Sequence, residues 1–180
     1  AFLKSEGYDL GEKNEKALEK EGDEDKFKEI KKLLERYNDE IYLPIDFAIS
    51  KNDKRKEITS DELPTDENLF DIGEKTINKF KEILKYAKTI FLSGPCGVFE
   101  EDIFMKGTKE IFNFVAESDA FSIVGGGHTV AAVKKLGFEG KISHISTGGG
   151  SLEKFMMGEK LPVVEALKNA KDKHIKNSNL

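Results

Sequence analysis

Residues 121–151 read FSIVGGGHTVAAVKKLGFEGKISHISTGGGS, and this stretch decides the fold. It holds two short apolar runs, 121–124 and 142–145, with the length and composition of buried strands. Each run leads into a glycine triplet, and apolar residues recur at helical spacing after the first triplet, up to Gly137. The stretch therefore predicts a strand, a helix and a second strand, with a glycine-rich loop after each strand.

The same alternation extends toward the N-terminus. Residues 77–87 carry apolar side chains at helical spacing and run directly into a short apolar segment at 89–93, and residues 111–115 mark another helix. Strands that alternate with helices form a parallel sheet with helices on its faces. We therefore expect an α/β fold, a Rossmann-like three-layer sandwich with a parallel sheet and helices on both faces.

The N-terminal part is less regular. Residues 27–37 have the pattern of an amphipathic helix, and residues 41–49 that of a strand, which Pro44 restricts to a sheet edge or to its own start. Residues 50–71 are mostly charged and predict either a long surface connection or a short hairpin. We expect residues 1–168 to form one compact domain, with a last helix after Pro162, and residues 169–180 to be a polar tail.

The first residues do not resemble a natural start. The chain begins with Ala1 rather than Met, and residues 1–4 read like the end of a helix that Gly7 closes. We expect the sequence to be part of a longer protein.

Composition excludes several classes of protein. The 180 residues carry a formal net charge of -5 with both signs interleaved, which argues against a nucleic-acid or anionic-membrane surface. No apolar run approaches the roughly 20 residues of a membrane span, and no signal peptide is recognisable. The single cysteine, Cys96, has no partner for an internal disulfide, and we assign it no chemistry. A cytoplasmic protein is expected.

Three consecutive predicted strands end in unusual loops, at residues 94–100, 125–129 and 147–151. Ligands of open parallel sheets bind beyond the carboxyl ends of the strands, so these loops should open on one edge. A glycine triplet before a helix lets backbone N–H groups approach a phosphate, although glycine also makes tight turns for steric reasons alone. Neither the P-loop pattern nor the dinucleotide pattern Gly-x-Gly-x-x-Gly is present.

These loops resemble those of the phosphoglycerate kinase family. Residues 93–100 are similar to its Asn-Gly-Pro-x-Gly-Val-Phe-Glu signature, residues 124–133 to its Gly-Gly-Gly-Asp-Thr segment, and residues 141–151 to its last glycine-rich loop. The resemblance implies the C-terminal, nucleotide-binding part of such an enzyme. It implies phosphoryl transfer from 1,3-bisphosphoglycerate to ADP, with magnesium, to give 3-phosphoglycerate and ATP in glycolysis and gluconeogenesis.

The resemblance also implies roles for individual residues. Glu100 would hold the ribose hydroxyls, and Phe70 would lie near adenine. The nucleoside pocket would be lined by Gly94, Pro95 and Val98, and the nucleotide phosphates would be held by Gly126, Gly127, His128 and Thr129. The moving phosphoryl group would meet backbone N–H groups of Gly148, Gly149 and Gly150, which makes these three the catalytic candidates.

The sequence departs from the family pattern in several places. His128 replaces the usual Asp and Ser93 the usual Asn, and no residue is assigned as a metal ligand because imidazole is a poor ligand for Mg²⁺. The family's N-terminal domain, which binds phosphoglycerate, and the first strand of its C-terminal domain have no counterpart. We expect the isolated chain to be inactive. A non-catalytic nucleotide-binding module, a truncated structural remnant and a small NAD-dependent oxidoreductase remain alternatives.

Overall fold

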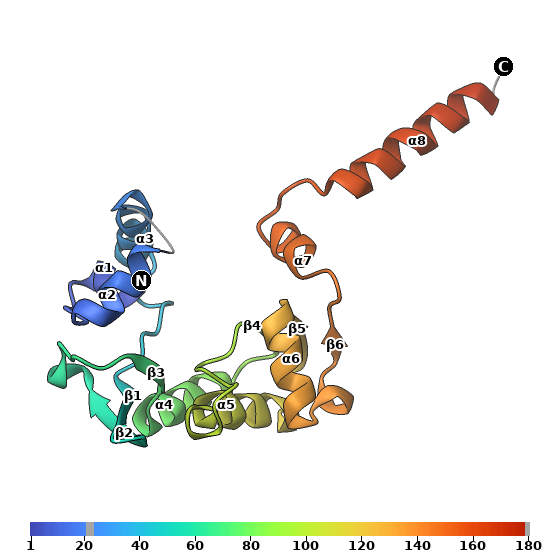
Figure 1. Cartoon of the computed structure of the whole chain (residues 1–180). Coiled ribbons are helices and arrows are strands. Elements are labelled where there is room, and N and C mark those ends of the chain that lie inside the picture. Colours follow the sequence, from blue (N-terminus) through green and yellow to red (C-terminus); the bar gives the residue numbers. More distant parts are fainter. Residues whose placement is uncertain (21–23, 179–180) are drawn as a thin grey trace. The chain divides into compact units, whose positions relative to one another are not determined.

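The computed structural model describes residues 1–20 and 24–178 (Figure 1). Contacts divide the chain into two compact units, Ala1–Lys88 with Pro95–Ala120, and Thr89–Gly94 with Phe121–Leu180. The first of these units contains an antiparallel sheet with a core of its own, which the sequence did not predict.

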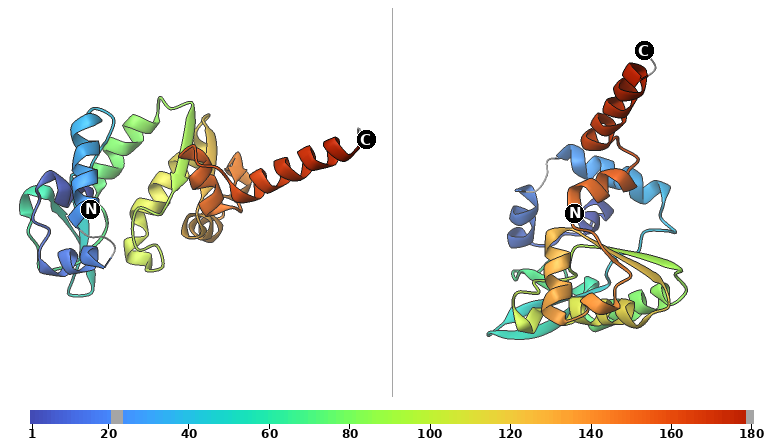
Figure 2. Two further views of the ribbon diagram at one scale, coloured as in Figure 1. Left: turned by 90° about the horizontal axis from the view of Figure 1, so that it is seen from above. Right: turned by 90° about the vertical axis from the view of Figure 1, so that its right-hand side faces the viewer.

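The first unit combines helices with a three-stranded antiparallel sheet in the order β2-β1-β3. Helices α1 and α3 pack against each other, as do α4 and α5 (Figure 2). The elements of this unit are α1 (Phe2–Glu6), α2 (Glu12–Glu19), α3 (Glu24–Arg36), β1 (Asp46–Lys51), β2 (Lys54–Thr59), β3 (Leu69–Ile72), α4 (Glu74–Leu84), α5 (Lys106–Glu117), and two short 3₁₀ helices at Ser60–Glu62 and Asp102–Phe104.

A hairpin occupies the charged region between residues 50 and 71. Asn52 and Asp53 both have positive φ, 52° and 56°, which matches the tight turn that joins two antiparallel strands. Of the two alternatives, a long surface connection or a short hairpin, the chain forms the hairpin. The strand expected at 41–49 begins only at Asp46, after Pro44. Phe47 and Ile49 form the core of this sheet with Ile58 of β2.

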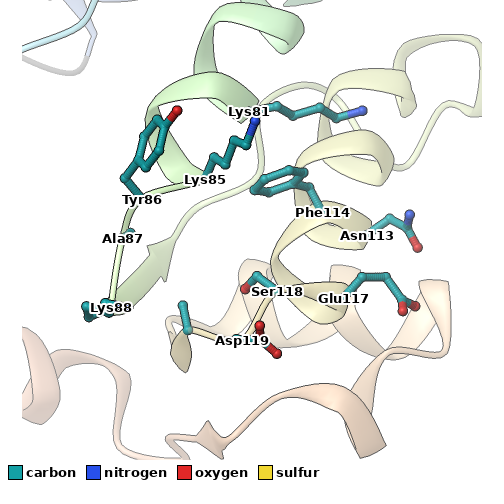
Figure 3. Close-up of a pocket in the computed structure, with 11 residues that line it drawn as sticks. Lys81, Lys85, Tyr86, Ala87, Lys88, Asn113, Phe114, Glu117, Ser118 and Asp119 are labelled. Atoms are coloured by element: carbon teal, nitrogen blue, oxygen red, sulfur yellow. The ribbon is translucent and has the colours of Figure 1, made fainter.

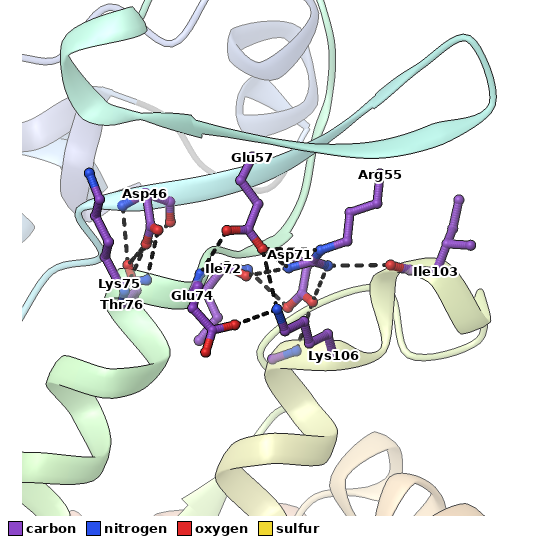
Figure 4. Close-up of polar contacts among 11 residues, drawn as sticks. Asp46, Arg55, Glu57, Asp71, Ile72, Glu74, Lys75, Thr76, Ile103 and Lys106 are labelled. Atoms are coloured by element: carbon purple, nitrogen blue, oxygen red, sulfur yellow. Dashed lines mark hydrogen bonds and ion pairs between the residues drawn. The ribbon is translucent and has the colours of Figure 1, made fainter.

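Asp46 fixes the start of α4. Its carboxylate accepts the backbone N–H groups of Lys75 and Thr76 at 2.8 and 2.7 Å, and the Thr76 hydroxyl donates to it at 2.5 Å (Figure 4). A carboxylate is favourable here because the first N–H groups of a helix have no acceptor within the helix. Near the N-terminus, Gly7 closes α1 with φ 102°, as its sequence position predicted.

The second unit contains the parallel sheet. Its strands lie in the order β4-β5-β6. Two reciprocal hydrogen bonds link Ser122 of β5 to Ser143, because the N–H of each serine donates to the hydroxyl of the other. The predicted α/β class, with a parallel sheet flanked by helices, is confirmed. The elements are β4 (Thr89–Ser93), β5 (Phe121–Gly125), α6 (Gly127–Leu136), a 3₁₀ helix at Glu139–Lys141, β6 (His144–Ile145), α7 (Gly149–Met156) and α8 (Pro162–Ser178).

Helix α8 includes the residue at which the sequence placed the domain boundary. It continues through residue 169, where the sequence predicted a change from domain to polar tail. Among the described residues, no helix combines the length and the apolar composition that a membrane crossing requires.

Candidate functional site

The two glycine triplets of the second unit lie against each other. Gly126, with φ 87°, is the N-cap of α6, and Gly148 is the N-cap of α7. A Cβ atom on Gly149 would lie 3.3 Å from the Gly126 Cα and 3.4 Å from the Gly126 nitrogen. The loops therefore approach so closely that a side chain at Gly149 would press on the backbone of the neighbouring loop.

Two helix N-termini meet at this contact. In α6 the first hydrogen bond of the helix is donated by the Val130 N–H to the Gly126 carbonyl, at 3.0 Å. In α7 it is donated by the Leu152 N–H to the Gly148 carbonyl, at 2.8 Å. The N–H groups ahead of these positions have no acceptor within their helix, and the helix dipole places partial positive charge there. This arrangement is suited to bind an anion.

The end of β4 is attached to the same region. The buried Thr129 hydroxyl accepts the Gly94 N–H at 2.6 Å, and the Ser93 hydroxyl lies 3.4 Å from a Glu153 carboxylate oxygen of α7. His128 is exposed in the first turn of α6. The structure thus brings together, within one unit, all predicted phosphate-binding and catalytic residues and also Gly94.

The remaining predicted residues belong to the first unit, which begins again at Pro95. A cavity of about 400 Å³ there is lined by Phe70, Pro95 and Val98, three residues predicted for the nucleoside. The Val98 N–H donates to the Phe70 carbonyl at 2.8 Å, so the loop and β3 are bonded directly. Glu100 lies exposed in the turn that follows Val98 and is not part of the cavity lining.

The other wall of this cavity comes from the region of α1 and α2. The sequence appeared polar here, and no site residue was predicted in it. The spacing held a signal, because positions 14, 17 and 18 fall on one face of α2. The additional lining residues from this region are Ala1, Leu3, Leu10, Asn14, Ala17 and Leu18.

Asn14 connects this wall to the rest of the cavity. Its amide nitrogen donates to the carbonyls of Leu10 and Glu67 at 2.8 and 3.0 Å, and its amide oxygen accepts the Leu69 N–H at 3.0 Å. Both amide donors are therefore used within the protein. The cavity therefore offers mainly apolar surface and few free side-chain donors.

Cys96 also borders the cavity. Burial, with a smaller contribution from the negative charge of Asp71, raises the pKa of its thiol to about 12. A protonated thiol is a weak nucleophile.

A larger cavity of about 600 Å³ lies elsewhere in the first unit, between the C-terminal ends of α4 and α5 (Figure 3). It is lined by Lys81, Lys85 and Lys88 on one side and by Glu117 and Asp119 on the other. It contains none of the predicted site residues. Within residues 1–20 and 24–178, no cluster of three or more His, Cys, Asp or Glu residues could hold a metal ion.

The fold and the paired helix N-termini define a class, the Rossmann-like α/β proteins whose glycine-rich loops follow the strands of a parallel sheet. Comparison with known proteins identifies the family. The family model described as "Phosphoglycerate kinase" matches residues 1–159, and the chain belongs to the phosphoglycerate kinase family.

Individual relatives agree with this assignment. The chain is 44% identical to the phosphoglycerate kinase of Methanothermus fervidus over 177 aligned residues, which are 97% of the chain. It is 43% identical to that of Pyrococcus abyssi over 176 aligned residues, which are 96% of the chain. The crystal structure of phosphoglycerate kinase from Pyrococcus horikoshii OT3 matches 96% of the chain with a TM-score of 0.85 and 41% identity. The chain spans 43% of the length of each of these three relatives.

Proposed function

We propose that this chain supplies the nucleotide site of a phosphoglycerate kinase. The whole protein would transfer a phosphoryl group reversibly between 1,3-bisphosphoglycerate and ADP, giving 3-phosphoglycerate and ATP. The observation that carries the proposal is the contact between Gly126 and Gly149, which joins two helix N-termini at one point. Family membership supports the same conclusion.

The proposal assigns the nucleoside and the phosphates of the nucleotide to different residues. Phe70, Pro95 and Val98 contact the nucleoside through the 400 Å³ cavity, with Gly94 next to them in the chain and Glu100 hydrogen-bonded to the ribose. The phosphates lie on the first turn of α6, against the N–H groups of Gly126, Gly127, His128 and Thr129. These interactions are present before and after transfer, so they determine affinity more than rate.

The first turn of α7 stabilises the transfer itself. Gly148, Gly149 and Gly150 direct N–H groups at the phosphoryl group as it moves between the two oxygens. An in-line displacement of this kind depends on positioning and charge stabilisation, and it requires no nucleophile from the protein. None of the residues assigned here acts as one.

Magnesium would enter with the phosphates of the nucleotide. It prefers oxygen ligands, and the imidazole of His128 does not provide one, so the residues of α6 do not form a magnesium site of their own. When bound, the ion would neutralise charge on the phosphate oxygens. His128 is assigned only to the phosphate contact through the first turn of its helix.

The phosphoglycerate end of the reaction requires residues outside this chain, whose relatives are more than twice as long. We therefore expect the isolated chain to bind ADP or ATP without turnover. The whole protein would work in glycolysis and gluconeogenesis in the cytoplasm, with no nucleic-acid or membrane partner. The alternative is a non-catalytic nucleotide-binding module or a truncated structural remnant, which would show no turnover even within a protein of full length.

The proposal is tested by calorimetric titration of the chain with magnesium-ADP, with NAD and 3-phosphoglycerate as controls. Selective binding of ADP supports the proposal. Equal binding of NAD would favour an oxidoreductase, whose Gly-x-Gly-x-x-Gly pattern is absent. If ADP does not bind, the chain is not a nucleotide site by itself.

A further inference from the structure

A buried carboxylate lies beneath the loop formed by residues 95–100, here called the nucleoside loop. The side chain of Asp71, in β3, is completely buried. Its carboxylate accepts hydrogen bonds from Nη1 of Arg55 at 2.8 Å, from the N–H of Gly107 at 2.8 Å and from the N–H of Ile72 at 2.9 Å (Figure 4). Burial raises the pKa of the Asp71 carboxyl, and the Gly107 N–H and the Arg55 guanidinium oppose that rise.

Arg55 connects three segments through one planar group. Besides Asp71, it donates to the Ile72 carbonyl at 2.9 Å, to the Ile103 carbonyl at 3.3 Å and to a carboxylate oxygen of Glu57 at 3.1 Å. Its side chain is only 15% exposed. The several donors of a guanidinium make these contacts at once, and the ammonium of a lysine cannot reproduce that geometry.

The nucleoside loop packs directly on this ion pair. A Cβ atom on Gly97 or on Gly107 would overlap the Asp71 carboxylate, so both backbones approach it as only glycine can. Gly97 belongs to the loop and Gly107 to the first turn of α5. The position of the carboxylate therefore sets the position of both segments.

Hydrogen bonds then hold three successive amides of the loop. The N–H groups of Cys96 and Gly97 donate to the Thr108 hydroxyl at 3.1 and 3.3 Å, and the Val98 N–H donates to the Phe70 carbonyl at 2.8 Å. Thr108 directly follows Gly107 in the chain, and Phe70 directly precedes Asp71. Each acceptor is thus the neighbour of a residue in the ion-pair network.

We propose that Arg55 is a positioning residue for nucleoside binding, which acts through Asp71 to fix the nucleoside loop against Phe70. The proposal rests on the function proposed above and adds to it a residue outside the cavity lining. Without Arg55, Asp71 would be a buried carboxylate without its charged partner, and relief of that strain would displace the loop. The glycine triplets that face the phosphates are built from other residues, so their anion binding should not depend on Arg55.

The first part of the test needs no ligand. Amide hydrogen exchange would be measured at Cys96, Gly97 and Val98 in Arg55→Met, in Arg55→Lys and in the control Arg36→Met. Arg36 is the chain's other arginine and is exposed in α3. We expect exchange at these amides to be at least about tenfold faster in Arg55→Met and intermediate in Arg55→Lys, which keeps the charge and so protects the fold. Arg36→Met should match the unaltered chain.

The second part compares ligands by calorimetry. Arg55→Met should weaken the binding of ADP about tenfold and leave the binding of inorganic pyrophosphate within about twofold of the unaltered chain. Unchanged exchange at the three loop amides overturns the proposal, and so does an equal loss for ADP and pyrophosphate. If the unaltered chain binds no ADP, the proposed function fails for this chain, whereas the exchange rates still decide whether Arg55 positions the loop.

Discussion

Replacement of Gly149 by valine tests the contact between the two glycine triplets. The Cβ atom would lie 3.3 Å from the Gly126 Cα, where a comfortable carbon contact is about 3.5–4.0 Å, and valine adds two further carbons. One loop must then move by roughly 0.5 Å, which stretches an amide-to-phosphoryl hydrogen bond from about 2.9 Å to the limit of such bonds. A hydrogen bond to a charged group contributes about 1.5–3 kcal/mol, so turnover should fall about 10- to 100-fold.

The assay is steady-state kinetics and ADP binding in a protein of the relatives' full length that carries this chain. ADP affinity should fall less than about threefold, because the residues of α6 still hold the phosphates. Gly140→Val is the control, since Gly140 lies in the 3₁₀ helix outside the proposed site and a Cβ there meets nothing within 4 Å. The reasoning is refuted if Gly140→Val loses as much turnover as Gly149→Val, or if affinity and turnover fall together.

Three further changes probe other parts of the chain. Glu100→Ala should weaken ADP binding about tenfold and leave the turnover of bound ADP unchanged, and an unaltered affinity in calorimetry would remove Glu100 from the site. Cys96 should react with iodoacetamide at pH 8 about 1,000-fold more slowly than an ordinary thiol, since its pKa is about 12 instead of 9.0; a rate near that of free cysteine would contradict the buried thiol. Asp46→Ala should lower the free energy of unfolding by about 2–3 kcal/mol in urea titrations, because it frees two helix N–H groups and Thr76. The exposed Asp39→Ala should change that energy by less than about 0.5 kcal/mol, and equal effects of the two variants would contradict the cap.

The parallel sheet could be predicted from the sequence because its signals are local. Each strand is a short apolar run that ends in glycine, and each helix shows its own spacing of apolar residues. The antiparallel sheet gave weaker signals. Strand β3 has only four residues, and β2 is a charged segment whose pairing depends on β1 rather than on its own composition. Pairing between strands is a property of the folded chain, so the separate core of the first unit was missed.

The candidate site shows the same limit at the level of single residues. Loop residues such as Pro95 and Val98 were predicted because their pattern resembles a known family. Asn14 and Arg55 lie in charged stretches, where a residue bonded inside the protein has the same local sequence as a solvated one. Only the folded structure distinguishes the two, since burial and hydrogen-bond partners come from segments far away in the chain.

The glycines of the triplets look equivalent in sequence, yet the structure requires glycine at different positions for different reasons. Gly126 needs a positive φ of 87°, and Gly149 needs room against the neighbouring loop. Gly127 and Gly150 face open space, and nothing in the fold forbids a side chain on either. If glycine is required at these two positions, the requirement comes from a ligand that occupies that space. Alanine at Gly127 or Gly150 should therefore leave the fold intact, and any loss of ADP binding that it causes would report the position of the phosphates directly.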